Sequence, residues 1–213
     1  MNKRSTAVSY LGLRQAIGYI GLLMPIVVMI VARLSDGISL DSVSAAYYTD
    51  GRDIFAGSLA AVGTFLLFYV DTAGIDRVLA KIAGAAGVGI GLLPMDLAYE
   101  KNFPPDRIAE LKMCVHGPLG YHIFVVATFF AIISYMVLFR FTKRDALNDT
   151  PQKDKRNIVY VTAGIVMLLS FAVIGVSKLM DPKGSIFWPE TFAIAAFSVA
   201  WLVKGQIVLK DPA

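Results

Sequence analysis

Cysteine and charge are both scarce in this chain of 213 residues. Cys114 is its one cysteine, so the sequence excludes an internal disulfide and offers no cysteine-based metal motif. Charged residues make up 17% of the chain, whereas hydrophobic residues make up 56%. Soluble domains carry about 25% charged residues, and a chain this apolar cannot bury all its hydrophobic side chains in a soluble core. We therefore expect the protein to lie in a lipid bilayer.

A signal-peptide cleavage motif and an internal repeat are also lacking. The first apolar run extends from Ala16 to Ala32, and the Arg33-Leu34-Ser35-Asp36 sequence that follows it makes no convincing small-x-small cleavage site, so we expect an uncleaved first helix. The formal net charge is +4. This charge predicts no nucleic-acid partner, because excess Lys and Arg in a multi-pass membrane protein usually set its orientation.

Six apolar segments are long enough for transmembrane helices, which need about 20 residues each. We predict an all-α fold of one domain over residues 1–213, a polytopic bundle of six helices at about residues 16–32, 54–70, 78–98, 117–139, 158–176 and 187–203. With the N-terminus inside, 13 of the 20 Lys and Arg residues fall in the inner segments. The positive-inside rule then places both termini in the cytoplasm. We expect the protein to lie in the bacterial cytoplasmic (inner) membrane.

Small residues form a stripe on the third predicted helix, residues 78–98. Ala83, Gly87 and Gly91 recur at every fourth position, and so do Ala80 and Gly84. Small side chains at this spacing let neighbouring helices approach closely. We expect this helix at the centre of the bundle, and the same face would also suit contact with a second copy of the chain.

Two tryptophans stand on the last predicted helix. Trp188 and Trp201 are 13 residues apart, which is about 20 Å along a helix. This spacing predicts aromatic anchors near opposite membrane interfaces.

Four predicted helices carry an ionisable residue at a similar depth. Counted from the cytoplasmic helix ends at about 1.5 Å per residue, the four lie about 21 to 27 Å up: Asp53, Asp96, His122 and Glu190. The hydrocarbon core is about 30 Å thick, so they lie near its outer rim. Ionisable groups at this depth are costly when they face lipid, so we expect them to pair or to line a polar cavity. The alternative is that each one caps a helix or meets lipid headgroups.

The loop at residues 41–55 adds hydroxyl, basic and aromatic side chains at the same level. We predict an outward-facing polar pocket for a small or lipidic ligand, with a possible coupling to protons or ions. Its candidate ligand-binding residues are Ser44, Tyr48, Arg52, Asp53, Asp96, His122 and Glu190. Asp53 and Glu190 would hold a charge or a cation. His122 would move a proton, and Arg52 would attract an anionic headgroup.

Two other functions stay open. A membrane hydrolase would use Ser42 or Ser44 as nucleophile and His122 as base, with candidate catalytic residues Ser44, Asp53, His122 and Glu190. Imidazole and carboxylates also suit zinc, so Asp53, His122 and Glu190 are candidate ligands of that metal. A structural or assembly protein would use the carboxylates only as helix caps.

Five short motifs are spread along the chain. They are Ser42-Val43-Ser44-Ala45 with Tyr47, Arg52-Asp53-Ile54-Phe55-Ala56-Gly57, His122 followed by Phe129-Phe130, Phe187-Trp188-Pro189-Glu190, and Ala196-Phe197 through Trp201-Leu202-Val203-Lys204-Gly205. Together they resemble a family of small bacterial inner-membrane proteins that has no established activity. The resemblance covers nearly the whole chain and implies an integral inner-membrane protein.

The chain is also similar, more remotely, to the alkaline ceramidase and adiponectin-receptor superfamily of seven-helix hydrolases. That likeness implies a zinc-dependent hydrolase whose pattern includes Ser-x-x-x-His before a downstream Asp. Here Ser44 is followed four residues later by Tyr48, and a closing His-x-x-x-His is absent. Both departures remove side chains that would bind the metal.

Overall fold

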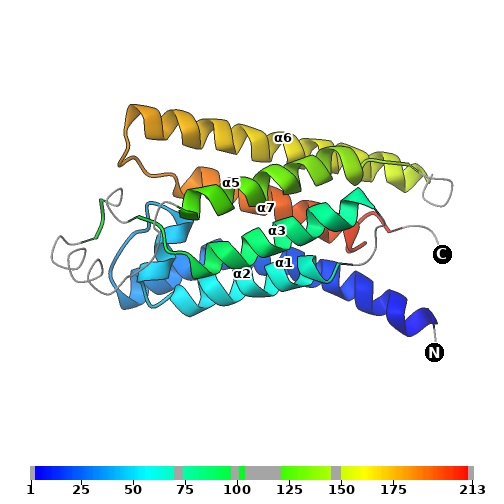
Figure 1. The fold of residues 1–213 in the computed structure, drawn as a ribbon, viewed down its shortest axis with the longest axis horizontal. Coiled ribbons are helices and arrows are strands. Elements are labelled where there is room, and N and C mark those ends of the chain that lie inside the picture. Colours follow the sequence, from blue (N-terminus) through cyan, green and yellow to red (C-terminus); the bar gives the residue numbers. More distant parts are fainter. Residues whose placement is uncertain (1–2, 70–73, 97–100, 104–120, 145–149, 211–213) are drawn as a thin grey trace.

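The computed structural model of the chain is built of helices (Figure 1). It describes residues 3–69, 74–96, 101–103, 121–144 and 150–210, and these ranges contain no strand. Their long helices are α1 (Lys3–Ser35), α2 (Arg52–Leu67), α3 (Ile75–Leu92), α5 (Tyr121–Tyr135), α6 (Pro151–Met180) and α7 (Phe187–Lys204). A 3-10 helix, η1 (Val43–Tyr48), lies between α1 and α2, and a π-helix, η3 (Met136–Arg140), continues α5.

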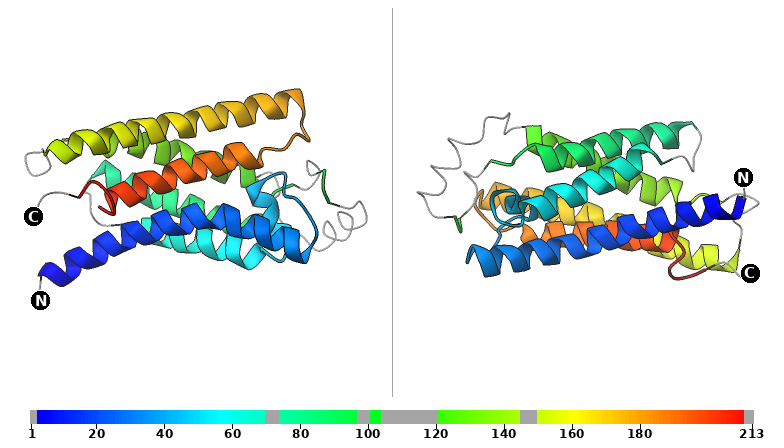
Figure 2. Two further views of the ribbon diagram at one scale, coloured as in Figure 1. Left: turned by 180° about the vertical axis from the view of Figure 1, so that it is seen from behind. Right: turned by 90° about the horizontal axis from the view of Figure 1, so that it is seen from below.

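The long helices pack as a closed ring that follows the chain order. α2 packs between α1 and α3, α3 packs against α5, and α7 packs between α6 and α1. Contacts of α5 and η3 with α6 complete the ring. α1 begins and α7 ends at one end of the bundle, here called the termini end, whereas η1 lies at the opposite end, here called the η1 end (Figures 1 and 2).

Three stretches are long and apolar enough to cross a membrane: Tyr10–Ser35, Tyr121–Arg140 and Pro151–Met180. Their outward faces carry large hydrophobic side chains, among them Leu23, Ile123 and Leu169, which are exposed. A contiguous apolar surface of this kind marks contact with lipid or protein rather than with water. The all-α class that the sequence predicts is confirmed, and so is the presence of helices that suit a bilayer.

Several helices begin or end away from the predicted positions for local reasons. α6 begins at Pro151 because Thr150 caps it, the Thr150 side chain accepting the Lys153 amide, and because proline suits the first helical turn. α3 ends at Leu92 because Pro94 holds the residue before it in an extended conformation, with Leu93 at φ −100° and ψ 111°. The predicted residues 70, 97–98 and 117–120 lie outside the described ranges.

The small-residue stripe of α3 is buried against two neighbouring helices. A side-chain carbon at Gly84 would lie 2.6 Å from the carbonyl oxygen of Gly63 on α2. At Gly87 it would lie 3.2 Å from the ring of Phe129 on α5. Close approach is therefore confirmed, but the central position is wrong: α3 is one member of the ring, between α2 and α5.

Aromatic and basic side chains meet near the termini end. Trp201 packs against the rings of Tyr69 and Phe141 at centroid distances of 5.3 and 5.4 Å. The buried Lys153 ammonium donates to the Phe141 carbonyl at 2.5 Å. Trp201 is 0% exposed whereas Trp188 is 65% exposed, so the prediction that Trp201 anchors the protein at an interface is wrong.

Candidate functional site

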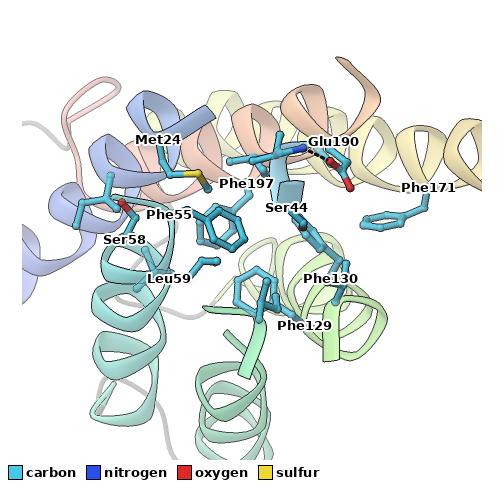
Figure 3. A pocket seen from close by; sticks show the side chains of 18 of the residues that line it. Met24, Ser44, Phe55, Ser58, Leu59, Phe129, Phe130, Phe171, Glu190 and Phe197 are labelled. Carbon is cyan, nitrogen blue, oxygen red and sulfur yellow. Dashed lines mark hydrogen bonds between the residues drawn. The ribbon is translucent and has the colours of Figure 1, made fainter. Parts of the chain in front are cut away.

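A cavity of about 60 Å³ lies inside the ring next to η1 (Figure 3). Side chains from η1 and from each of the six long helices of the described chain line it. Five of the lining residues are phenylalanines: Phe55, Phe129, Phe130, Phe171 and Phe197. Polar side chains in the wall come from Ser44, Ser58 and Glu190. The cavity is therefore a mostly apolar space with a few polar groups, which is the usual composition of a small-molecule site.

Glu190 joins the wall of the cavity to η1. It lies in the first turn of α7 and is partly buried. Its Oε2 atom accepts two hydrogen bonds, from the Val43 amide at 2.6 Å and from the Ser42 hydroxyl at 2.9 Å. Figure 3 shows this carboxylate beside η1, with the bond to the Val43 amide drawn as a dashed line. Glu190 therefore fixes the position of η1 relative to α7.

Backbone contacts hold the same two segments together. The Ile186 amide donates to the Asp41 carbonyl at 2.7 Å, and the Ser185 hydroxyl donates to that carbonyl at 3.2 Å. Ser42 caps η1, because its hydroxyl oxygen accepts the Ser44 amide. Residues 41–44 therefore run beside the start of α7, and this placement brings Ser44 into the cavity wall.

Tyr48, Arg52 and Asp96 form a separate group outside the cavity wall. The Tyr48 hydroxyl donates to the Met95 carbonyl at 2.6 Å, and Asp96 lies close enough to interact electrostatically with Tyr48. Burial, with smaller contributions from Tyr47 and Asp96, raises the pKa of Tyr48 to about 12. Arg52 is exposed, and its guanidinium donates to the Tyr47 hydroxyl at 3.0 Å. This group attaches η1 to the end of α3 and leaves Arg52 away from the cavity.

Asp53 and His122 also lie outside the cavity wall. Asp53 is exposed in the first turn of α2, where a carboxylate interacts favourably with the helix dipole. His122 is buried, and its Nδ1 lies 2.6 Å from the Leu93 carbonyl, so this nitrogen carries the proton and donates it. Of the seven residues predicted to share one pocket, the wall of this cavity includes Ser44 and Glu190, and a ligand site shared by all seven stays a prediction.

The predicted metal and nucleophile arrangements are not assembled. In the parts of the chain that the structure describes, no three His, Cys, Asp or Glu residues gather closely enough to hold a metal ion. Asp53, His122 and Glu190 therefore do not form the zinc site, because each faces different surroundings: solvent, the Leu93 carbonyl and η1. Among the described residues, His122 and Ser44 are not hydrogen-bonded to each other, so His122 is not positioned as a base for the Ser44 hydroxyl.

Sequence reasoning missed the phenylalanine wall. Phe55, Phe129, Phe130 and Phe197 belong to the motifs quoted above, but the residue type alone did not select them because the chain has 13 phenylalanines. A usable signal was the position of Phe55 two residues after Asp53, since two residues of helix rotate the side chain by about 200° and place Phe55 on the face opposite Asp53. Phe171 carried no comparable signal, because it lies within a continuous apolar run.

Comparison with known proteins adds no relative. No protein-family model, curated protein or solved structure matches the chain. The two resemblances seen in the sequence therefore stay predictions, and the function rests on the geometry of the cavity.

Proposed function

We propose that the protein spans the bacterial cytoplasmic membrane six times, with both termini in the cytoplasm. Three apolar stretches support spanning, and α2, α3 and α7 run alongside them in the same ring. An even number of spans agrees with α1 beginning and α7 ending at one end of the bundle (Figure 1). Basic residues gather at that end, where Arg14 donates to the Lys204 carbonyl and Arg140 pairs with Asp76. The positive-inside rule places this end in the cytoplasm.

Within that topology, the protein binds a small amphipathic molecule in the cavity next to η1. The observation that carries this proposal is the composition of the wall, where five phenylalanine rings from five different positions surround a space that one carboxylate borders. An apolar cavity of this kind holds water poorly because water finds too few polar partners there. An apolar tail in the cavity, with its polar head at Glu190 and Ser44, satisfies both parts of the wall.

The seam between α5 and α6 supports access from the bilayer. Of the neighbouring long helices in the ring, α5 and α6 share the least extensive contact, and η3 provides much of the connection. The rings of Phe130 and Phe171 lie across this seam with centroids 4.9 Å apart. Both side chains are partly exposed and both line the cavity. A lipid-soluble ligand therefore reaches the cavity when these two side chains rotate.

Photolabelling tests the proposal directly. The full chain in phosphatidylcholine nanodiscs is irradiated with a diazirine derivative of octanol, and labelled residues are mapped by mass spectrometry. We expect saturable labelling of the phenylalanine wall that excess 1-octanol prevents. Ile174 lines the cavity and its neighbour Val173 is exposed on the outer face of α6, so Ile174→Trp should abolish the saturable component and Val173→Trp should preserve it. Labelling that stays on outward-facing residues and never saturates would show that the cavity binds nothing of this class.

A further inference from the structure

We propose that the cavity selects amphiphiles with a protonated amine head over those with an anionic head. This inference rests on the proposed function, since it names the ligand class of the same cavity. It rests on the wall around Glu190, where one carboxylate oxygen is already used by the protein and the other is available.

The two oxygens of Glu190 have different surroundings. Oε2 accepts both hydrogen bonds that η1 donates, from Val43 and Ser42. Within the described residues no group donates to Oε1. A carboxylate has about four acceptor sites, so Glu190 keeps acceptor capacity toward the cavity it lines. A ligand head that donates a hydrogen bond therefore meets an acceptor that η1 leaves unused.

The cations of this region are directed elsewhere. Lys178 lies close enough to interact electrostatically with Glu190, but its ammonium donates to the carbonyls of Pro182 and Gly184, each at 3.0 Å. Arg52 is exposed and bonded to Tyr47, so the prediction that it attracts an anionic headgroup to the cavity is not favoured. Among the described residues that line the cavity, Glu190 is the one that ionises.

The phenylalanine rings favour a cationic head group, as the carboxylate does. The face of an aromatic ring attracts a cation and repels an anion. Charge pairs gain strength where water is excluded, whereas a second negative charge beside a partly buried carboxylate is disfavoured. An alkylammonium head therefore gains an ion pair with Glu190 and contacts with the rings, and a carboxylate head meets repulsion from both.

Competition with the octanol photolabel tests the preference. The competitors are octylamine, 1-octanol and octanoate, which share an eight-carbon tail and differ in head charge at neutral pH. Glu190→Gln removes the charge and keeps an oxygen that accepts from η1. Asp50→Asn is the matched control, because Asp50 is an exposed carboxylate at the same end of the molecule and is not part of the wall. Ratios between variants cancel the partition of each competitor into the nanodisc lipid.

We expect octylamine to protect the cavity at concentrations at least tenfold lower than octanoate. Glu190→Gln should raise the protecting concentration of octylamine at least tenfold, change that of 1-octanol less than threefold and lower that of octanoate. Asp50→Asn should leave the protecting concentrations of all three competitors unchanged. If the ratio of the protecting concentrations of octylamine and octanoate is the same in the parent chain and in Glu190→Gln, the preference for an amine head is overturned. Saturable labelling by the octanol probe in that experiment would still support the proposed function. Absence of saturable labelling in the cavity overturns both.

Discussion

Replacing Glu190 by Ala is expected to release η1 from α7. The substitution removes the two hydrogen bonds on Oε2 and leaves the buried Val43 amide without its acceptor. A hydrogen bond to a charged group contributes about 1.5–3 kcal/mol net. Because Glu190 is partly exposed and water replaces part of each bond, we expect the free energy of unfolding to fall by about 2–4 kcal/mol. Folded proteins have about 5–15 kcal/mol in total, so the variant should remain folded.

The comparison with Gln separates hydrogen bonding from side-chain volume. Glu190→Gln retains an accepting oxygen and should cost about 1 kcal/mol, the difference between charged and neutral hydrogen bonds. A double-mutant cycle with Ser42→Ala should give a coupling energy of about 1 kcal/mol, because the two side chains are in direct contact. Reversible unfolding in mixed detergent micelles, followed by circular dichroism, measures all of these values.

Hydrogen exchange supplies a local readout of the same contact. Peptides covering η1 should exchange faster in Glu190→Ala than in Glu190→Gln, while peptides from α3 should be unchanged. The reasoning is refuted if Ala and Gln variants lose equal stability and the coupling with Ser42 is below about 0.3 kcal/mol, the usual error of additivity.

Two further predictions concern packing and pH. Gly84→Ala should lower the free energy of unfolding by about 1–3 kcal/mol, because the added carbon would lie 2.6 Å from the Gly63 carbonyl oxygen. Gly57→Ala is the control in the same unfolding assay. Nothing lies within 4 Å of a carbon added at Gly57, so this variant should be as stable as the parent chain or more stable. The raised pKa of Tyr48, about 12, means that its neutral phenol favours the folded state. This contribution is complete below the unfolded pKa of about 10 and is lost as pH rises toward 12. Tyr48→Phe should remove that part of the stability–pH curve, and an unchanged curve would contradict the assignment.

The all-helical class and the positions of the helices were accessible from the sequence because they depend on local properties. Apolar runs, proline positions and small-residue spacing predict where helices lie and how closely they pack, as Pro94 and Gly84 illustrate. The level of a residue along its helix was accessible in the same way. Glu190 and Ser44 lie far apart in the sequence, and both line the same cavity.

The direction of each side chain around its helix was not accessible. Asp53, His122 and Glu190 were predicted to share a level, yet one faces solvent, one donates to Leu93 and one binds η1. Rise per residue gives depth, but rotation depends on the neighbours against which each helix packs. Trp201 shows the same limitation. Its distance from Trp188 suits a second membrane interface, but its side chain is completely buried.

The sequence by itself determined an all-helical, lipid-compatible chain and a carboxylate next to a hydroxyl-rich loop. Only the tertiary structure decided that the loop folds into η1, that Glu190 holds it through one oxygen, and that phenylalanines from distant segments enclose the space beside it. The physical reason is that helix formation and membrane partition are sums over neighbouring residues, whereas a cavity exists only where the faces of several helices meet.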